Sequence, residues 1–496
     1  MESLSGLMYG LSIAFQPGNL FFCFLGCVVG TLIGVLPGIG PTATLALLLP
    51  ITFHLPSSTA IIMLSGIYYG AMYGGSTTSI LVNIPGEAAS LVTCLDGYQM
   101  ARQGRGGPAL GIAAIGSFIA GTLSVITLMF LAPALASFAL HFSSPEYAAI
   151  VIFGLTLISF LGSGSKLKAF MMGGVGLLLG AIGSDPVESV DRFTFGSFFL
   201  LDGVGLIPLI MGLFGISEIF LNLEEEEFRT ILKEKIKNLF PNGKEWLESA
   251  WPMVRGTLIG LFMGIIPGGN AIIAATMSYA VEKRVSKHPE KFGTGVIEGV
   301  AGPESANNAA AAGSFIPLLS LGIPTNAVMG LLLAALMLHG IIPGPLLISR
   351  HPDLFWSVIA SMYIGNVMLL ALNLPLIGLW VQILKVPYAY LFPFLFLFCL
   401  LGSFSLKNTI FDIAVMIFFG GVGFLLKKFE YEATPLIFAF LLGPMFEEHF
   451  RRSLIMSYGG FSTFLERPIA AVFVLATVIV LLSPLFWRVK HKRSEQ

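Results

Sequence analysis

The chain has 496 residues, of which 55% are hydrophobic and only 11% are charged, whereas a soluble globular domain usually carries about 25% charged residues. This deficit excludes an ordinary soluble domain and predicts an integral membrane protein. The formal net charge of -1 provides no global field that would attract nucleic acid or a strongly acidic partner. The four cysteines form no C-x-x-C pair and no cluster with histidines, so we interpret them as packing residues.

Apolar runs long enough to span a bilayer, which takes roughly 20 residues per helix, recur along the whole chain. In the first half they cover residues 20–53, 58–75, 108–140, 146–163, 166–183 and 199–221. In the second half they cover residues 256–281, 305–338, 354–384, 388–402, 408–426, 433–446 and 468–487. We therefore predict an all-α polytopic membrane protein with about 10–12 transmembrane helices.

Charge positions divide this chain into two membrane halves. The predicted parts are a first membrane repeat, residues 1–222, a charged cytoplasmic linker, 223–254, a second membrane repeat, 255–487, and a basic cytoplasmic tail, 488–496. The N-terminus lacks the basic start of a cleavable signal, so we expect it to be retained. The positive-inside rule places Arg102 and Arg105 in the cytoplasm and the segment 185–191 outside, where Arg192 is an exception to the rule.

Short motifs of the first half return in the second half in the same order. The matched pairs are Gly30-Thr31-Leu32-Ile33-Gly34 with Gly256-Thr257-Leu258-Ile259-Gly260, residues 34–40 with 264–270, and residues 75–85 with 313–324. In both copies a Pro-Gly pair interrupts a hydrophobic stretch and leaves pieces too short to cross a membrane as helices. The sequence therefore predicts a duplication with broken helices.

The charges beside each break predict its sidedness. The second break has Arg255 before it and Lys283, Arg284, Lys287 and Lys291 after it, which is typical of a re-entrant hairpin with both ends in the cytoplasm. The first break has no basic flank, which suits a hairpin that enters from the opposite face. The two halves are therefore predicted to be inverted repeats. The alternative is a pair of kinked packing helices with Gly-x-x-x-Gly contacts.

Irregular backbone at membrane depth is tolerated only where it is buried or lines a cavity, so the breaks predict a substrate site. The candidate substrate-binding residues lie at the breaks and are Gly38, Gly40, Thr42, Ser76, Thr77, Thr78, Asn83, Gly268, Gly269, Asn270, Thr325 and Asn326. No basic residue lies within the breaks, so an anion would be held by helix N-termini and by hydroxyl and amide groups.

A polar segment after the second hairpin supplies candidate cation-coupling residues, namely Glu304, Ser305, Asn307 and Asn308. Their oxygens suit a hard cation such as Na⁺, and a buried Glu304 could carry a proton. The alternative is a solvated loop with a helix cap at Ser305. The motifs G-x-x-x-x-G-K-[ST], H-E-x-x-H and G-x-S-x-G are missing, so we expect no enzyme and no cofactor other than a coupling cation, Na⁺ or H⁺.

At these residues the sequence resembles the TctA family, the large membrane subunit of bacterial tripartite tricarboxylate transporters. The resemblance lies in residues 30–41, 73–76, 85–87, 96–98, 107–111, 298–314 and 322–324, and it extends over roughly residues 15–465. One departure is Thr325, where a small Gly or Ser is expected after the proline, because threonine resists positive φ.

The resemblance implies a secondary transporter of the bacterial inner membrane that takes up a citrate-like carboxylate with a coupled cation. It also implies two protein partners, a small four-helix membrane subunit of the TctB type and a periplasmic substrate-binding protein of the TctC type. We expect a lipid bilayer around the chain and no nucleic acid. The alternative functions are an anion channel, which would want a continuous polar lining, and a membrane-embedded enzyme, which would want a catalytic cluster.

Overall fold

The computed structural model describes residues 2–36, 40–161, 165–185, 187–188, 190–224, 238–383 and 388–494, and most of them are helical. The elements of the first half are α1 (Glu2–Ala14), α2 (Pro17–Val35), α3 (Pro41–Thr52), α4 (Ser57–Val82), η1 (Ala88–Leu91), α5 (Thr93–Met100), η2 (Ala101–Arg105), α6 (Gly106–Ala139), α7 (Ser144–Leu161), α8 (Lys166–Gly180), β1 (Gly183–Ser184), β2 (Asp191–Arg192), η3 (Phe198–Leu200), α9 (Leu206–Ile210), η4 (Met211–Ile216) and α10 (Ser217–Glu224).

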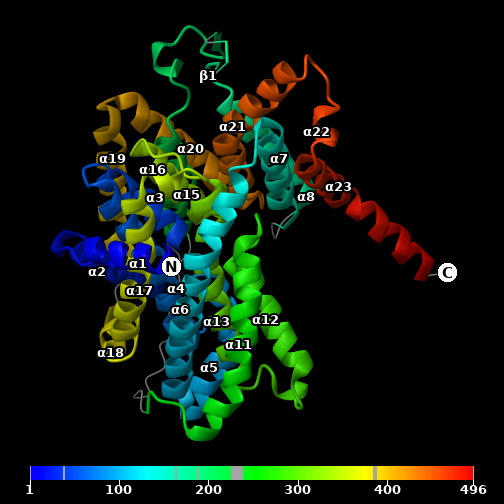
Figure 1. The fold of residues 1–496 in the computed structure, drawn as a ribbon. Helices are drawn as coiled ribbons and strands as arrows, with labels where there is room; N and C mark the ends of the chain where they lie inside the picture. The colour runs from blue at the N-terminus through cyan, green and yellow to red at the C-terminus, as the bar shows by residue number, and fades with distance from the viewer. Residues whose placement is uncertain are drawn as a thin grey trace.

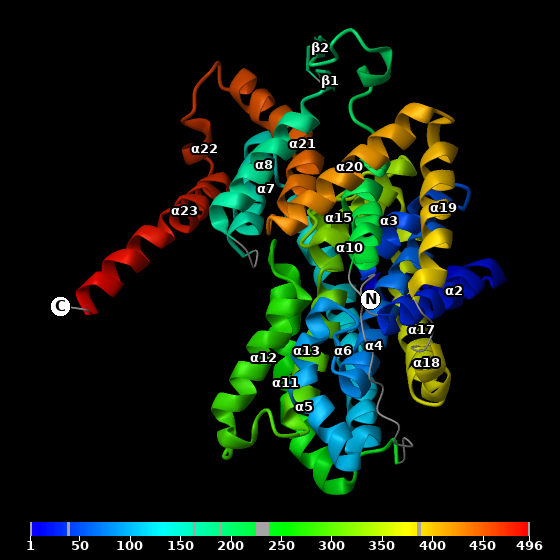
Figure 2. The ribbon, with the colours of Figure 1, turned by 180° about the vertical axis from the view of Figure 1, so that it is seen from behind.

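The elements of the second half are α11 (Gly243–Ile265), α12 (Ala271–Val285), η5 (Pro289–Lys291), α13 (Glu298–Gly313), α14 (Phe315–Leu321), α15 (Ala327–Leu338), α16 (Leu347–Arg350), α17 (Pro352–Asn373), α18 (Ile377–Ile383), α19 (Tyr388–Lys407), α20 (Ile410–Lys428), α21 (Thr434–Met456), α22 (Thr463–Glu466) and α23 (Pro468–Ser494). Figure 1 shows α4, α5, α6, α11, α12 and α13 in the lower part of the molecule and α7, α8, α20 and α21 in the upper part. The C-terminal helix α23 extends away from the rest in both views (Figures 1 and 2).

The predicted all-α polytopic membrane protein is confirmed. Within the described part of the chain, 5 helical segments are long and apolar enough to cross a membrane: Pro17–Val35, Thr93–Ala139, Leu206–Glu224, Pro352–Asn373 and Ile410–Lys428. Shorter apolar helices include Pro41–Thr52, Ser144–Ser159, Ala327–Leu338 and Pro468–Ser483. The number of spans therefore stays a prediction, because short helices on either side of a break can share one crossing.

The predicted linker between the halves is helical at its end. Residues 225–237 lie outside the described part of the chain, and α11 begins at Gly243, where the Asn242 side chain accepts hydrogen bonds from the backbone N–H groups of Lys244 and Glu245. Glu245 also pairs with Arg105 at 2.7 Å. This ion pair joins the start of the second half to the end of η2 in the first half.

Glycines of α2 lie directly against the backbone of α4. A Cβ atom built on Gly26, Gly30 or Gly34 would lie 2.3, 2.3 or 2.4 Å from a carbonyl oxygen of α4. The contacted residues advance along α4 as the glycines advance along α2, so the two helices run in the same direction. Only glycine permits this approach, because real Cβ atoms essentially never come within 3.0 Å of such an atom.

The second half repeats this packing between α11 and α13. A Cβ atom on Gly256, Gly260 or Gly264 would lie 2.2, 2.2 or 2.5 Å from a carbonyl oxygen of α13. The structural register therefore matches Gly26 with Gly256 and so on along each helix. The two Pro-Gly breaks match with the same spacing between the halves. The two Gly-Thr-Leu-Ile-Gly pentads match with a spacing that differs by about one helical turn.

The second broken segment is a hairpin. Its two helices, α11 and α12, are joined by an ion pair between Arg255 and Glu282, with Arg255 Nε 2.8 Å from Glu282 Oε1. These two residues are nearly equidistant from Gly268 along the chain, which requires the helices to run in opposite directions. Glu282 is 2% exposed, so a largely buried ion pair holds the two helices of the hairpin together.

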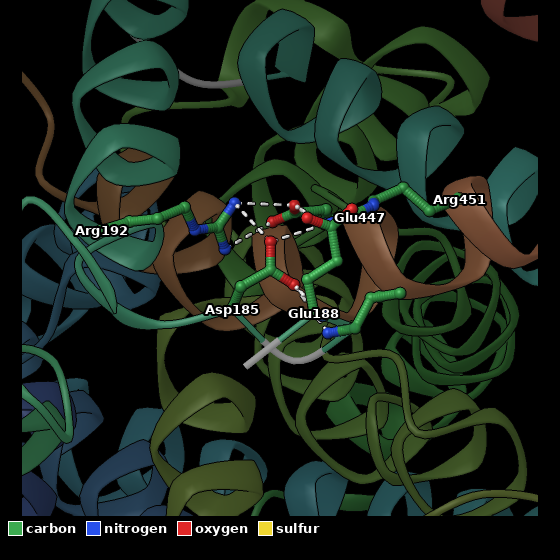
Figure 3. A network of polar contacts seen from close by, with 6 residues as sticks. Asp185, Glu188, Arg192, Glu447 and Arg451 are labelled. Carbon is green, nitrogen blue, oxygen red and sulfur yellow. Dashed lines mark hydrogen bonds and ion pairs between the residues drawn. The ribbon is translucent and has the colours of Figure 1, made fainter. Parts of the chain in front are cut away.

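A polar network fastens the strand pair to α21 (Figure 3). Arg192 of β2 pairs with Glu447 at 2.8 Å, and Arg451 pairs with Asp185 at 2.6 Å and with Glu188 at 2.5 Å. Backbone N–H groups of residues 187 and 188, together with Arg451, hold the pKa of Asp185 well below its usual value. Arg192, the exception to the positive-inside rule, is therefore neutralised by neighbouring carboxylates.

Candidate functional site

A cavity of about 450 Å³ lies where the broken segments of the two halves meet. Small-molecule sites commonly measure roughly 300–1,000 Å³. Its lining includes Gly40–Ala43, Glu87–Ala89, Gly268, Asn270–Ile273 and Thr325–Val328. Within the second half, the break at Gly268 touches the segment just before α15, because the backbone N–H of Gly268 donates to the carbonyl oxygen of Thr325 at 2.9 Å.

Three α-helices begin at this cavity. They are α3 after Gly40, α12 after Asn270 and α15 after Asn326. The first N–H groups of a helix have no partner within the helix, and the helix dipole makes this end attractive to anions. Three such ends around one cavity are an arrangement that attracts negatively charged groups.

Asn270 and Asn326 have matching roles at these helix ends. Asn270 Oδ1 accepts from the backbone N–H of Ile273 at 2.9 Å, and Asn326 Oδ1 accepts from that of Met329 at 3.0 Å. Each side chain is therefore an N-cap, which shapes the helix end and is worth about 0.5–2 kcal/mol. The cap uses only the amide oxygen of each side chain.

Thr325 supplies a hydroxyl that the surrounding protein does not use. Its side chain is 0% exposed, lines the cavity, and its Oγ1 has no hydrogen-bond partner among the described residues. Burying a hydroxyl without a partner is unfavourable, which indicates a ligand or water partner. The residue type predicts a conflict with positive φ at Thr325, but Thr325 does not adopt a positive φ. The left-handed residue of this break is Gly322, with φ 73°.

Other predicted substrate residues lie away from this cavity. The Thr78 hydroxyl donates to the Val35 carbonyl oxygen at 2.7 Å, and Ser76 and Thr77 line a separate small pocket beside α6. Asn83 is the exposed left-handed end of α4, with φ 61°. A Cβ atom on Gly269 would lie 2.0 Å from the carbonyl oxygen of Met263, so this glycine is required by backbone packing. Gly38 lies outside the described residues.

The four predicted cation residues lie on α13 but face different neighbours. Glu304 accepts hydrogen bonds from Ser76 Oγ at 2.6 Å and from Thr93 Oγ1. Asn307, one turn later, donates from Nδ2 to Glu87 Oε1 at 3.0 Å.

The other two residues face α6. Asn308 donates to Ser117 Oγ at 2.6 Å, and a Cβ atom on Gly116 would lie 3.0 Å from Ser305 Oγ. Neither Glu304 nor Asn307 lines the cavity itself. Asn307 is connected to the cavity through Glu87, whereas Glu304 bonds to Ser76, and Ser305 and Asn308 face α6.

Four charged residues that line the cavity were not among the predicted site residues: Glu87, Glu218, Lys427 and Glu432. Glu87 lines the cavity and occupies the place in the first half that Asn326 occupies in the second, since both cap a helix two residues after a proline. The repeat could therefore have identified it. Lys427, at the end of α20, also lines the cavity and pairs with Glu218, and no local motif marks it.

The TctA family, described as the tripartite tricarboxylate transporter TctA family, matches residues 20–438. The chain therefore belongs to this transporter family. It is a multi-pass membrane protein with a cavity at the junction of its two broken segments.

Two proteins of Agrobacterium vitis are similar to the chain. An uncharacterized 52.8 kDa protein in the TAR-I ttuC' 3'region is 51% identical over 498 residues, which cover 100% of this chain and 99% of the relative. An uncharacterized protein in the TAR-II ttuC' 3'region is 48% identical over 236 residues, which cover 48% of this chain and 98% of the relative. No solved structure matches the chain.

Proposed function

We propose that this chain is the large permease subunit of a tripartite transporter that takes up a citrate-like di- or tricarboxylate across the bacterial inner membrane, driven by a cation gradient. The observation that carries this proposal is the convergence of three helix N-termini on one cavity. A helix N-terminus attracts a carboxylate with a partial positive charge rather than a full one. The attraction is therefore weak enough for the ligand to be released again.

Cation coupling follows from the charge of the substrate. Moving one elementary charge against a potential of 100 mV costs about 2.3 kcal/mol, so a multivalent anion needs co-transported positive charge. The only basic side chain that lines the cavity in the described part of the chain is Lys427, and it is paired with Glu218. We assign Glu304 and Asn307 to cation coupling, with Na⁺ or H⁺ as the coupled ion.

The proposed partners are the small four-helix membrane subunit and the periplasmic binding protein that the family's tripartite systems imply. The test is reconstitution of the chain in liposomes with and without both partners, followed by uptake of labelled citrate, succinate and related carboxylates. We expect uptake that requires the binding protein and ceases when both the Na⁺ and the proton gradients are collapsed. Uptake that persists in either condition would overturn the proposal.

Two substitutions test the assigned residues. Asn270→Ala removes an N-cap at the cavity and Glu304→Ala removes the buried carboxylate, and we expect both to abolish uptake while membrane insertion is retained. Glu248→Ala is the control, because Glu248 lies on the surface of α11, where its partner is the exposed Lys244. Normal uptake in both site variants would contradict the assignment of the cavity.

A further inference from the structure

Glu87 is an acidic residue at the cavity on which three helix N-termini converge. Its side chain is 6% exposed and lines the cavity. Glycines fix this position: a Cβ atom on Gly86 would lie 2.0 Å from the Gly34 carbonyl oxygen, and one on Gly75 would lie 2.6 Å from Glu87 Cγ. These contacts hold the backbone of residue 86 and the start of the Glu87 side chain directly against α2 and α4.

The hydrogen bonds of Glu87 do not neutralise it. Oε2 accepts from the backbone N–H of Ala89 at 2.7 Å and Oε1 accepts from Asn307 Nδ2 at 3.0 Å. In the described ranges neither Glu87 nor Glu304 takes part in an ion pair. The other titratable groups on this side are Tyr68 of α4 and Glu304 of α13, and Glu218, Lys427 and Glu432 also line the cavity.

Two buried oxygens lack partners among the described residues, one on the neighbour of Glu87 and one elsewhere on the cavity wall. They are Oδ1 of Asn307, which is 1% exposed, and Oγ1 of Thr325. Asn307 Oδ1 belongs to the same amide that donates to Glu87. An unused acceptor beside a carboxylate suits a bound cation, and it also suits a carboxylic acid O–H, which needs an acceptor.

An anionic substrate and an ionised Glu87 oppose each other in this cavity. Two like charges about 5 Å apart, at an effective dielectric constant of about 20, repel enough to weaken binding roughly a hundredfold or more. A proton or Na⁺ bound to the Glu87 carboxylate removes this penalty. By linkage, the substrate must then raise the affinity for that positive charge by the same factor.

We propose that Glu87 is a coupling residue of the cavity in addition to Glu304: one monovalent cation, a proton or Na⁺, neutralises its carboxylate when the carboxylate substrate binds. This inference rests on the proposed transport function and adds a specific site of coupling. With a proton, an O–H bond forms on Glu87 and the Asn307 amide oxygen accepts it. With Na⁺, Glu87 and Asn307 supply oxygen ligands.

The second half of the chain supplies an internal comparison. Asn326 has the place of Glu87 in the repeat, with the same N-cap role and a similar backbone conformation, φ -148° against -139°. A neutral side chain is thus sufficient to form this helix end. The negative charge of Glu87 is therefore not needed for the fold of the break.

The experiment compares the wild-type protein with Glu87→Gln in liposomes that contain the complete transporter. Exchange of internal unlabelled citrate for external [¹⁴C]citrate is measured without ion gradients, and [¹⁴C]succinate is tested in parallel. One series varies the pH in the absence of Na⁺, and a second series varies the Na⁺ concentration at fixed pH. Without the cation, we expect the apparent affinity of the wild-type protein for citrate in exchange to fall on the order of a hundredfold. The arm that shows this loss identifies the ion as a proton or Na⁺.

For Glu87→Gln we expect the roughly hundredfold effect of the cation on apparent affinity to be lost, together with loss of gradient-driven accumulation. Glu248→Gln is the matched control and should behave as the wild type. If Glu87→Gln keeps the wild-type cation dependence, the inference is wrong. If the wild-type protein exchanges no carboxylate under any condition, the proposed function itself fails.

A second variant keeps the test valid if Glu87→Gln does not fold. Asn326→Asp retains a good N-cap and adds a negative charge at the matching position of the cavity. We expect its citrate exchange to require a higher cation concentration, with affinity lowered at least tenfold when the cation is limiting. Unchanged cation dependence in Asn326→Asp would also overturn the inference.

Discussion

Replacing Asp96 by alanine removes the carboxylate that fastens α5 to the loop before α13. Asp96 is 0% exposed. Its Oδ1 accepts from the backbone N–H groups of Gly293, Gly295 and Val296 at 2.9, 2.8 and 3.0 Å. Its Oδ2 accepts from the Tyr279 hydroxyl at 2.9 Å. One side chain therefore satisfies three backbone donors of the segment that leads to Glu304 and Asn307.

The magnitude follows from these donors. Each buried donor left without a partner costs about 1–3 kcal/mol, and water can reach some of them because residue 293 is exposed and residue 296 is only partly buried. We expect Asp96→Ala to lower the free energy of unfolding by about 3–6 kcal/mol. Asp96→Asn keeps one acceptor oxygen and should cost about half as much.

The assay is thermal unfolding of the purified protein in detergent. We expect the melting temperature to fall by several degrees in Asp96→Ala and by less in Asp96→Asn. Asp191→Ala is the control, because the carboxylate of Asp191 is exposed and its partner is the exposed hydroxyl of Ser184. Equal melting temperatures for Asp96→Ala and Asp191→Ala would refute the reasoning.

Three further predictions concern the packing and the outer network. In Gly260→Val, the new Cβ atom would lie 2.2 Å from the Ala306 carbonyl oxygen. We therefore expect a loss of folding free energy greater than the about 1–3 kcal/mol of ordinary overpacking. Size-exclusion chromatography should show this loss as aggregation. Arg255→Ala leaves the buried Glu282 carboxylate unpaired and should cost about 3–5 kcal/mol, and adding Glu282→Gln should restore part of the melting temperature. The folded pKa of Asp185 lies below its unfolded value of about 3.9, so its stabilisation is complete above that pH and is lost as the pH falls below it. Hydrogen exchange of the strand pair, corrected for intrinsic rates, should rise only below about pH 4, and a rise that begins near neutral pH would contradict this.

Part of the cavity lining could be predicted from local sequence. Pro and Gly interrupt helices wherever they lie in a chain, so the breaks at Gly40 and Asn270 could be placed without tertiary information. Both line the cavity, as do Gly268, Thr325 and Asn326. Ser76 and Asn83 do not line it, because proximity to a break along the chain does not decide which way a helical residue points.

The sequence by itself determined the class of protein, the broken segments and the family, because composition, apolar run length and Pro-Gly breaks are properties of consecutive residues. Only the tertiary structure decided the register of the repeat and the neighbours of each polar side chain. Successive helical residues point about 100° apart, so Asn307 reaches Glu87 while Asn308 reaches Ser117. Glu87 joins the cavity because glycine contacts between α2 and α4 let its backbone approach, and such contacts between distant segments exist only in the packed protein.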